Sequence, residues 1–258
     1  MSPTSKFLIL LSALLAVGAV LTGCGAETEA EPLPPLAASL AIDDSVTTNL
    51  PGIETAYAED AAVLMNSVIA RGGSFTASIF RGSAAAYTVG SLEVDPQASL
   101  ARRRRDSQGS AEAIGGTLGQ VLGLSKMTPA VAERLETLPE GSAVADALRE
   151  AVRSVQEHEG TRWAVVASDG INNTNGEELP LGNVSHAARI LSEAVGDLNA
   201  RKVNIAMVGI GLSQEKLGSG RAQPLVEAWE KVCHDLEAAT CEIRSEPTLP
   251  AALQEGGS

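Results

Sequence analysis

The chain has 258 residues, of which 44% are hydrophobic and 3% aromatic, and its formal net charge at pH 7 is −13. This length and hydrophobic content allow one domain with a full core and additional terminal segments. The negative charge argues against nucleic acid as a partner, because an acidic surface repels the phosphate backbone.

The first residues predict an export signal. Lys6 is followed by an apolar run from Phe7 to Leu21 that is too short and too lightly flanked for a stable membrane span, so we expect residues 1–23 to be removed on export. The run ends in Leu21-Thr22-Gly23-Cys24, which resembles the lipobox of bacterial lipoproteins. The resemblance implies that Cys24 becomes the lipid-modified first residue of a protein held on the extracytoplasmic face of the cell membrane. The alternative is an ordinary secretory signal with an incidental cysteine.

Three segments follow the predicted signal. Residues 24–35 are acidic and contain prolines, which is typical of a tether without stable structure. Residues 36–250 alternate short apolar runs with helical patterns, so we expect an α/β domain whose mostly parallel, doubly wound sheet has helices on both faces. Residues 251–258 are predicted to be a disordered tail.

The apolar patterns give the expected order of strands and helices. The strands are predicted at residues 36–42, 74–80, 86–92, 163–167, 203–210 and 240–243, and the helices at residues 57–68, 144–155, 184–198 and 225–236. Arg81-Gly82-Ser83 separates the second strand from the third, which predicts a hairpin and an antiparallel edge strand. Residues 95–141 have helical tendency but are interrupted by glycines at 109, 115, 116, 119 and 123, so we expect one or two loosely defined helices there.

Arg102 to Arg105 form a basic run within residues 95–141. A run of this kind is usually a solvated helix face. Binding to anionic lipid or to another anionic polymer is the alternative.

Cys233 and Cys241 remain once Cys24 is assigned to lipid. An exported protein lies in an environment where disulfides persist, so we expect these two neighbouring cysteines to form a local bridge. His234 beside Cys233 could suggest a metal ligand, but no second ligand pair has suitable spacing.

Polar residues follow two of the predicted buried strands. Asp43-Asp44-Ser45-Val46-Thr47 follows the first, and an extended backbone would point the alternate side chains of Asp43, Ser45 and Thr47 the same way. Asp169 follows another strand and Ser142 precedes a helix, so all of these residues are expected at one edge of the sheet. Carboxylate and hydroxyl oxygens suit a hard cation such as Mg²⁺.

These residues resemble the von Willebrand factor type A domain and its metal-ion-dependent adhesion site. Asp43 to Thr47 is similar to the first metal loop of the family, Asp-x-Ser-x-Ser, with threonine in place of the last serine. Gly141-Ser142 followed by Ala147-Leu148 is similar to the second loop, and Ser168-Asp169-Gly170 is similar to the third, usually Thr-Asp-Gly. The resemblance covers residue 36 to about residue 243.

The resemblance implies a binding function and no catalysis. Ser45, Thr47 and Ser142 would supply oxygen ligands to Mg²⁺, or to Mn²⁺ or Ca²⁺, while Asp43 and Asp169 would hold coordinating waters. A cation held mainly by neutral hydroxyls keeps most of its charge, so it can attract an acidic residue of a protein ligand.

Two other functions remain open at this point. The same fold with an unused site would be a structural or scaffold protein of the envelope. A metal-dependent hydrolase using Asp43 and Asp169 is less well supported, because no serine lies in a nucleophile-elbow context and Gly209-x-Gly211 lacks the rest of a phosphate-binding fingerprint.

Overall fold

The computed structural model describes residues 33–44, 52–82, 87–138, 142–172, 179–213 and 220–254. The predicted signal, Cys24, Ser45 and Thr47 lie outside these residues. The chain divides into two units between Leu33 and Pro34. The larger unit, residues 34–258, is described by itself.

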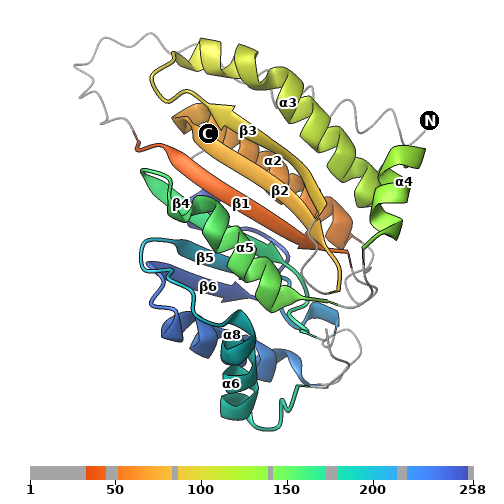
Figure 1. Ribbon diagram of the computed structural model, residues 1–258, viewed down its shortest axis with the longest axis vertical. Helices are drawn as coiled ribbons and strands as arrows, with labels where there is room; N and C mark the ends of the chain where they lie inside the picture. Colours follow the sequence, from red (N-terminus) through yellow and green to blue (C-terminus); the bar gives the residue numbers. More distant parts are fainter. Residues whose placement is uncertain are drawn as a thin grey trace. The chain divides into compact units, whose positions relative to one another are not determined.

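One six-stranded sheet forms the centre of this unit, with strand order β3-β2-β1-β4-β5-β6. The strands are β1 (Leu36–Asp43), β2 (Gly73–Phe80), β3 (Tyr87–Val94), β4 (Thr161–Ala167), β5 (Asn204–Val208) and β6 (Thr240–Arg244). Only β3 is antiparallel to its neighbour, and the other pairs are parallel (Figure 1). The predicted fold class is therefore confirmed, including the antiparallel edge strand. We call the side of the sheet where the parallel strands begin the amino edge, and the side where they end the carboxyl edge.

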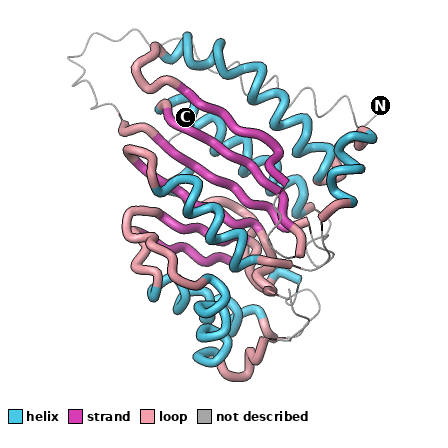
Figure 2. Tube along the Cα trace, viewed as in Figure 1, coloured by secondary structure: helices cyan, strands magenta, loops and turns pink. Residues whose placement is uncertain are grey.

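Helices cover both faces of the sheet (Figure 2). They are α2 (Ile53–Arg71), α3 (Leu100–Val121), α4 (Pro129–Glu136), α5 (Val144–Gln156), α6 (Val184–Val195), α8 (Ala222–Asp235) and α9 (Ala251–Gln254). Ala37 and Ala41 of β1 face the core shared with α5, α6 and α8, whereas Leu40 and Ile42 face the core shared with α2 and α3. Since both faces of β1 are buried, its sequence is mostly apolar, with Ser39 as the one polar residue before Asp43. Within the described residues, no helix has the length and apolar character needed to cross a bilayer.

The region expected to hold loosely defined helices forms two regular ones. Helix α3 is continuous over 22 residues although Gly109, Gly115, Gly116 and Gly119 lie within it. Its buried residues Ile114, Leu118 and Val121 belong to the core shared with β2 and β3. Packing of this apolar face offsets the poor helix propensity of glycine, which sequence alone does not show.

The end of the described chain also differs from the prediction of a disordered tail at residues 251–258. Ala251–Gln254 forms the short helix α9, in which Leu253 is buried. The Ser67 hydroxyl of α2 donates to the carbonyl of Leu253 at 3.4 Å. Residues 251–253 are therefore part of the folded domain, and residues 255–258 lie outside the described residues.

Cys233 of α8 and Cys241 of β6 form a disulfide, as predicted. Their Cα atoms are 6.1 Å apart, and the two residues are separated by 8 positions in the sequence. The bridge therefore joins α8 to the outer strand β6, whose only paired neighbour in the sheet is β5.

Reduction of this disulfide is expected to lower the free energy of unfolding by about 2–3 kcal/mol, the value for a small closed loop in the loop-entropy model. For a domain of this size the melting temperature would fall by about 5–10 °C. Calorimetry with and without a phosphine reductant measures the shift, and the Cys233→Ala/Cys241→Ala variant serves as the control, because its melting temperature should not respond to reductant. An equal response in this variant would contradict the assignment.

Candidate functional site

Two buried carboxylates lie at the carboxyl ends of the adjacent strands β1 and β4. Asp43 is the last residue of β1, and Asp169 is the second residue after β4; each is 2% exposed. From β1 the chain continues to β2 on one side, whereas β4 lies on the other side. The two carboxylates therefore lie where the strand order reverses, which is the usual ligand position in open α/β sheets.

Two serine hydroxyls bind the Asp43 carboxylate. Ser142, two residues before the start of α5, donates to Asp43 Oδ2 at 2.6 Å, and Ser168, directly after β4, donates to the same oxygen at 2.7 Å. Both serines are fully buried. Three segments that are far apart in the sequence thus meet at one carboxylate oxygen.

The Asp169 carboxylate is held in a similar way by the segment after β5. Ser213 Oγ donates to Asp169 Oδ2 at 2.6 Å, and the backbone N–H of Ile171 donates to Oδ1 at 3.0 Å. The turn from Asp169 to Ile171 requires glycine at its centre, because Gly170 has a φ of 80° and an added Cβ would lie 2.9 Å from the side chain of Ile210. Asp169 therefore has a fixed orientation, set by its own turn and by β5.

Tyr57 of α2 lies in the negative field of both carboxylates. Its side chain is buried, and this burial, together with the charges of Asp43 and Asp169, raises the pKa of its hydroxyl. The hydroxyl also lies against Gly209, where an added Cβ would be 2.5 Å from Tyr57 Oη. A negative potential that acts on a neighbouring group in this way also attracts a cation.

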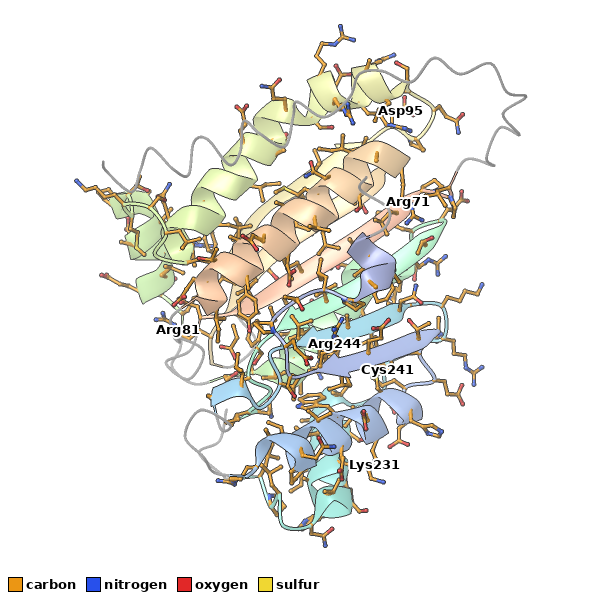
Figure 3. The ribbon with its side chains drawn as sticks, turned by 180° about the vertical axis from the view of Figure 1, so that it is seen from behind. Arg71, Arg81, Asp95, Lys231, Cys241 and Arg244 are labelled. Carbon is orange, nitrogen blue, oxygen red and sulfur yellow. A yellow bond between two sulfur atoms is a disulfide. The ribbon has the colours of Figure 1, made fainter. Side chains whose placement is uncertain are left out.

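An ion pair lies beside this site, between the residues that directly follow β1 and β2. Arg81 follows β2 and binds the Asp44 carboxylate at 2.6 Å. Burial raises the pKa of Asp44, while the charge and the hydrogen bond of Arg81 act in the opposite direction. Figure 3 shows Arg81 at one end of the strands and Arg71 at the other. The sequence pattern gave Asp44 no role, because its partner is close only through the pairing of β1 with β2.

The structure thus brings Asp43, Ser142 and Asp169 together at the carboxyl edge, whereas Ser45 and Thr47 lie outside the described residues. Sequence reasoning missed Ser168 as a partner of Asp43, and it missed Ser213 and Tyr57. The Gly209-x-Gly211 pattern after β5 was the available signal for Ser213, since Gly211 donates its N–H to the Asp169 carbonyl at 2.8 Å.

The described side chains that surround Asp43 and Asp169 through hydrogen bonds offer oxygen atoms to a cation. Among the described residues, no three His, Cys, Asp or Glu side chains lie together as a possible metal site. A cation at the carboxyl edge would therefore be held by two carboxylates together with hydroxyls, directly or through water, which suits Mg²⁺ better than a soft metal.

The protein is similar to known proteins in its overall structure. No family model matches the sequence, and no curated protein matches it. The structure is similar to a von Willebrand factor type A protein from Catenulispora acidiphila, with 17% identity, a TM-score of 0.43, and coverage of 86% of this chain and 41% of that one. It is also similar to BatB from Bacteroides thetaiotaomicron, with 15% identity, a TM-score of 0.42, and coverage of 86% and 94%.

A third similar structure is the pilus adhesin SpaC from Lactobacillus rhamnosus GG, with 9% identity, a TM-score of 0.46, and coverage of 87% of this chain and 30% of that one. The chain therefore spans less than half the length of the first and third of these proteins. The strand order and the described side chains define its class independently of them, as a doubly wound α/β domain with an acidic, hydroxyl-rich site at the switch point between β1 and β4.

Proposed function

We propose that this domain holds a divalent cation, Mg²⁺ in the first place, at the carboxyl edge between β1 and β4, and that it binds an acidic residue of another protein through this cation. The observation that carries the proposal is the pair of buried carboxylates, Asp43 and Asp169, each accepting a serine hydroxyl at 2.6–2.7 Å. By the resemblance stated above, Ser45 and Thr47 would complete the set of donors.

The chemistry of these donors favours a binding role. Hydroxyl ligands are neutral, so a cation that they hold retains charge for an incoming carboxylate. Catalysis is less well supported, because the described hydrogen bonds of Asp43 and Asp169 come from serine hydroxyls and a backbone N–H, whereas His158 contacts Ser74 at the amino edge. We therefore infer a protein-interaction domain that is not an enzyme.

We further propose that Cys24 carries a lipid anchor, that residues 24–35 form the tether, and that the domain acts at the extracytoplasmic face of the membrane. The lipobox-like sequence before Cys24 supports this proposal. The disulfide between Cys233 and Cys241 is an independent argument, because such bonds persist in oxidising compartments outside the cytoplasm.

Calorimetric titration of residues 25–258 with MgCl₂ tests the cation site. We expect binding by the wild type and an affinity lower by about tenfold or more in Ser142→Ala, which removes one ligand without removing a charge. Ser154→Ala is the matched control, because Ser154 lies on α5, the helix that follows Ser142, and its hydroxyl donates to the carbonyl of Ala151. An unchanged affinity in Ser142→Ala, or no binding by the wild type, would count against the site and favour a scaffold role.

The partner can be sought by capture on the immobilised domain from envelope extracts, once with Mg²⁺ and once with a chelator. Retention that requires Mg²⁺ is the expected result. Equal retention in both conditions would contradict binding through the cation.

A further inference from the structure

The basic run Arg102–Arg105 lies at the amino edge, next to the point where the chain from the proposed tether enters the sheet. Helix α3 starts at this edge because the antiparallel strand β3 ends there, with Val94 paired to Gly73. Arg103 donates to the carbonyl of Ala70 at 2.6 Å, and the next residue, Arg71, donates to the carbonyl of Pro34 at 2.9 Å. The run and the entering chain therefore contact adjacent residues at the end of α2.

The charges of this run are poorly compensated within the domain. Arg102, Arg104 and Arg105 are exposed, and the first turn of α3 contains no acidic residue. Asp106, itself exposed, pairs with both Arg102 and Arg105, and no ion pair within the described residues involves Arg104. Positive side chains at the start of a helix also oppose its dipole, so this placement does not stabilise α3.

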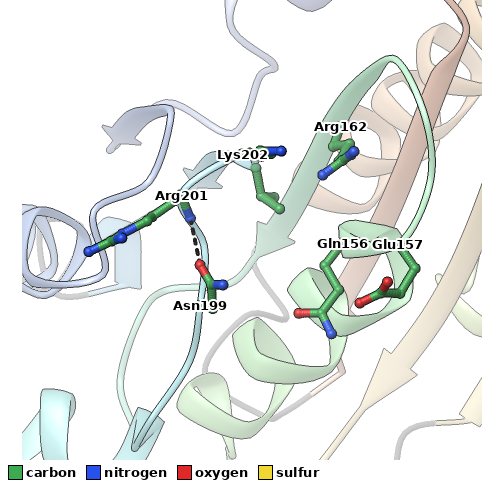
Figure 4. A pocket seen from close by; sticks show the side chains of 7 residues that line it. Gln156, Glu157, Arg162, Asn199, Arg201 and Lys202 are labelled. Carbon is green, nitrogen blue, oxygen red and sulfur yellow. Dashed lines mark hydrogen bonds between the residues drawn. The ribbon is translucent and has the colours of Figure 1, made fainter.

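A second cationic feature lies at the same edge, where β4 and β5 begin. A hollow of about 470 Å³ is lined by Arg162, Lys202, Gln156 and Glu157, among others. Figure 4 shows the side chains of Arg162 and Lys202 directed toward one another, whereas Arg201 points away. Among the described residues, the buried Nε of Arg162 has no hydrogen-bond partner. Two cations that converge in this way are stabilised by an anion between them.

We propose that the amino edge is the membrane-facing side of the domain, and that the α3 arginines and the Arg162–Lys202 hollow bind the headgroups of anionic phospholipids. This inference rests on the proposed lipid anchor. Since the chain as a whole carries a formal net charge of −13, an anionic bilayer repels most of its surface, and contact is restricted to the basic part. The carboxyl edge, with Asp43 and Asp169, is then turned away from the membrane and toward partners.

A chemically anchored protein tests this orientation. All residues of both core clusters lie between residues 36 and 253, so residues 24–258 contain the whole folding unit. Cys24 is the single free thiol of this protein, because the sequence has three cysteines and Cys233 and Cys241 are bridged. It can be coupled to a maleimide lipid in vesicles of phosphatidylcholine, with or without phosphatidylglycerol.

Modification of arginines by phenylglyoxal, read by mass spectrometry, then reports which residues contact headgroups. We expect the rates at Arg102, Arg104 and Arg105 to fall by about fivefold or more on the anionic vesicles, and to recover in about 0.5 M salt. Arg189, exposed on α6, is the internal control and should react equally on both kinds of vesicle.

Charge-reversed variants separate local contact from net charge. Arg162, which lines the hollow, should also be protected in the wild type on anionic vesicles. Arg102→Glu/Arg104→Glu/Arg105→Glu should lose this protection of Arg162, whereas Lys126→Glu/Arg189→Glu/Lys231→Glu, with the same net charge, should retain it. If the arginines of the wild type react at the same rates on neutral and on anionic vesicles, the proposal is overturned. It is also overturned if inorganic phosphate, added to the protein on neutral vesicles, protects the arginines as strongly as anionic lipid does. Because the lipid is attached chemically, neither outcome depends on lipidation of Cys24 in cells or on cation binding at Asp43.

Discussion

At pH 8 the Asp60→Asn variant is expected to be more stable than the wild type by about 2–4 kcal/mol, and the difference is expected to vanish below about pH 4. Asp60 of α2 is a buried carboxyl group whose Oδ1 accepts from the N–H of Leu249 at 3.1 Å. Its Oδ2 has no hydrogen-bond partner within the described residues. Burial raises the pKa of Asp60 from 3.8 to about 7, opposed by the Leu249 hydrogen bond and the charge of Arg244 and assisted by Glu59.

The sign of the pH dependence follows from this raised pKa. The folded protein binds the proton more tightly than the unfolded chain, so the contribution of Asp60 to stability is complete below about pH 4 and is lost as the pH rises through about 7. A pKa rise from 3.8 to about 7 corresponds to at most about 4 kcal/mol. Asparagine keeps an acceptor for Leu249 but carries no charge at any pH.

Urea unfolding at pH 4, 6 and 8 measures this effect. The free energy of unfolding of the wild type should decrease relative to that of Asp60→Asn across this range. Asp106→Asn is the control, because Asp106 is exposed on α3 and its replacement should leave the pH profile of the wild type unchanged. Parallel profiles for the wild type and Asp60→Asn would contradict a raised pKa.

The sheet could be predicted from the sequence because its central strands are buried on both faces. Leu36 to Ile42 contains one polar residue, Ser39, and Trp163 to Ala167 is apolar throughout. Such runs between helical patterns are distinctive. Helix α3 and helix α9 were harder to predict, because their order depends on contacts with distant residues. Gly115 and Gly116 favour no helix on their own, and Leu253 is fixed by packing against the core that includes α2.

In the site, too, some residues could be located from local sequence pattern, whereas others depend on contacts between distant segments. Asp43 and Asp169 could be predicted to lie at one edge because each lies at the end of a buried apolar run, and parallel strands end on the same side. The Gly209-x-Gly211 pattern marks a turn near Ser213, but the contact of Ser213 with Asp169 forms only because the chain crosses from β5 back to the Asp169 turn. Tyr57 is the first residue of the helix predicted at residues 57–68, but its position beside both carboxylates depends on how α2 packs on the sheet.

Asp43 combines two roles that substitutions can separate, because its carboxylate is both an acceptor for two serines and a proposed partner of the cation. In the presence of a chelator, Asp43→Ala is expected to lower the free energy of unfolding by about 2–4 kcal/mol, since the buried hydroxyls of Ser142 and Ser168 lose their acceptor. Asp43→Asn keeps an acceptor oxygen, so under the same conditions its free energy of unfolding should fall by about 1 kcal/mol or less.

Magnesium should change this ranking. At a concentration of about 100 times the dissociation constant, a cation that binds only the folded state stabilises it by about 2.7 kcal/mol. We expect the wild type to gain this increment in urea unfolding, and both Asp43→Ala and Asp43→Asn to lose most of it. Asp44→Ala is the matched control, because it removes a neighbouring carboxylate that pairs with Arg81, and it should retain the increment.

The comparison of the two Asp43 variants decides which role the residue has. If Asp43→Asn folds as well as the wild type in chelator and does not respond to Mg²⁺, the negative charge serves the cation, and the hydrogen bonds to Ser142 and Ser168 only position it. If Asp43→Asn gains the full increment, the carboxylate is a structural acceptor, and a cation at this edge would depend on other oxygens. Since Asp43 is buried and lies where the strand order reverses, we expect the first result.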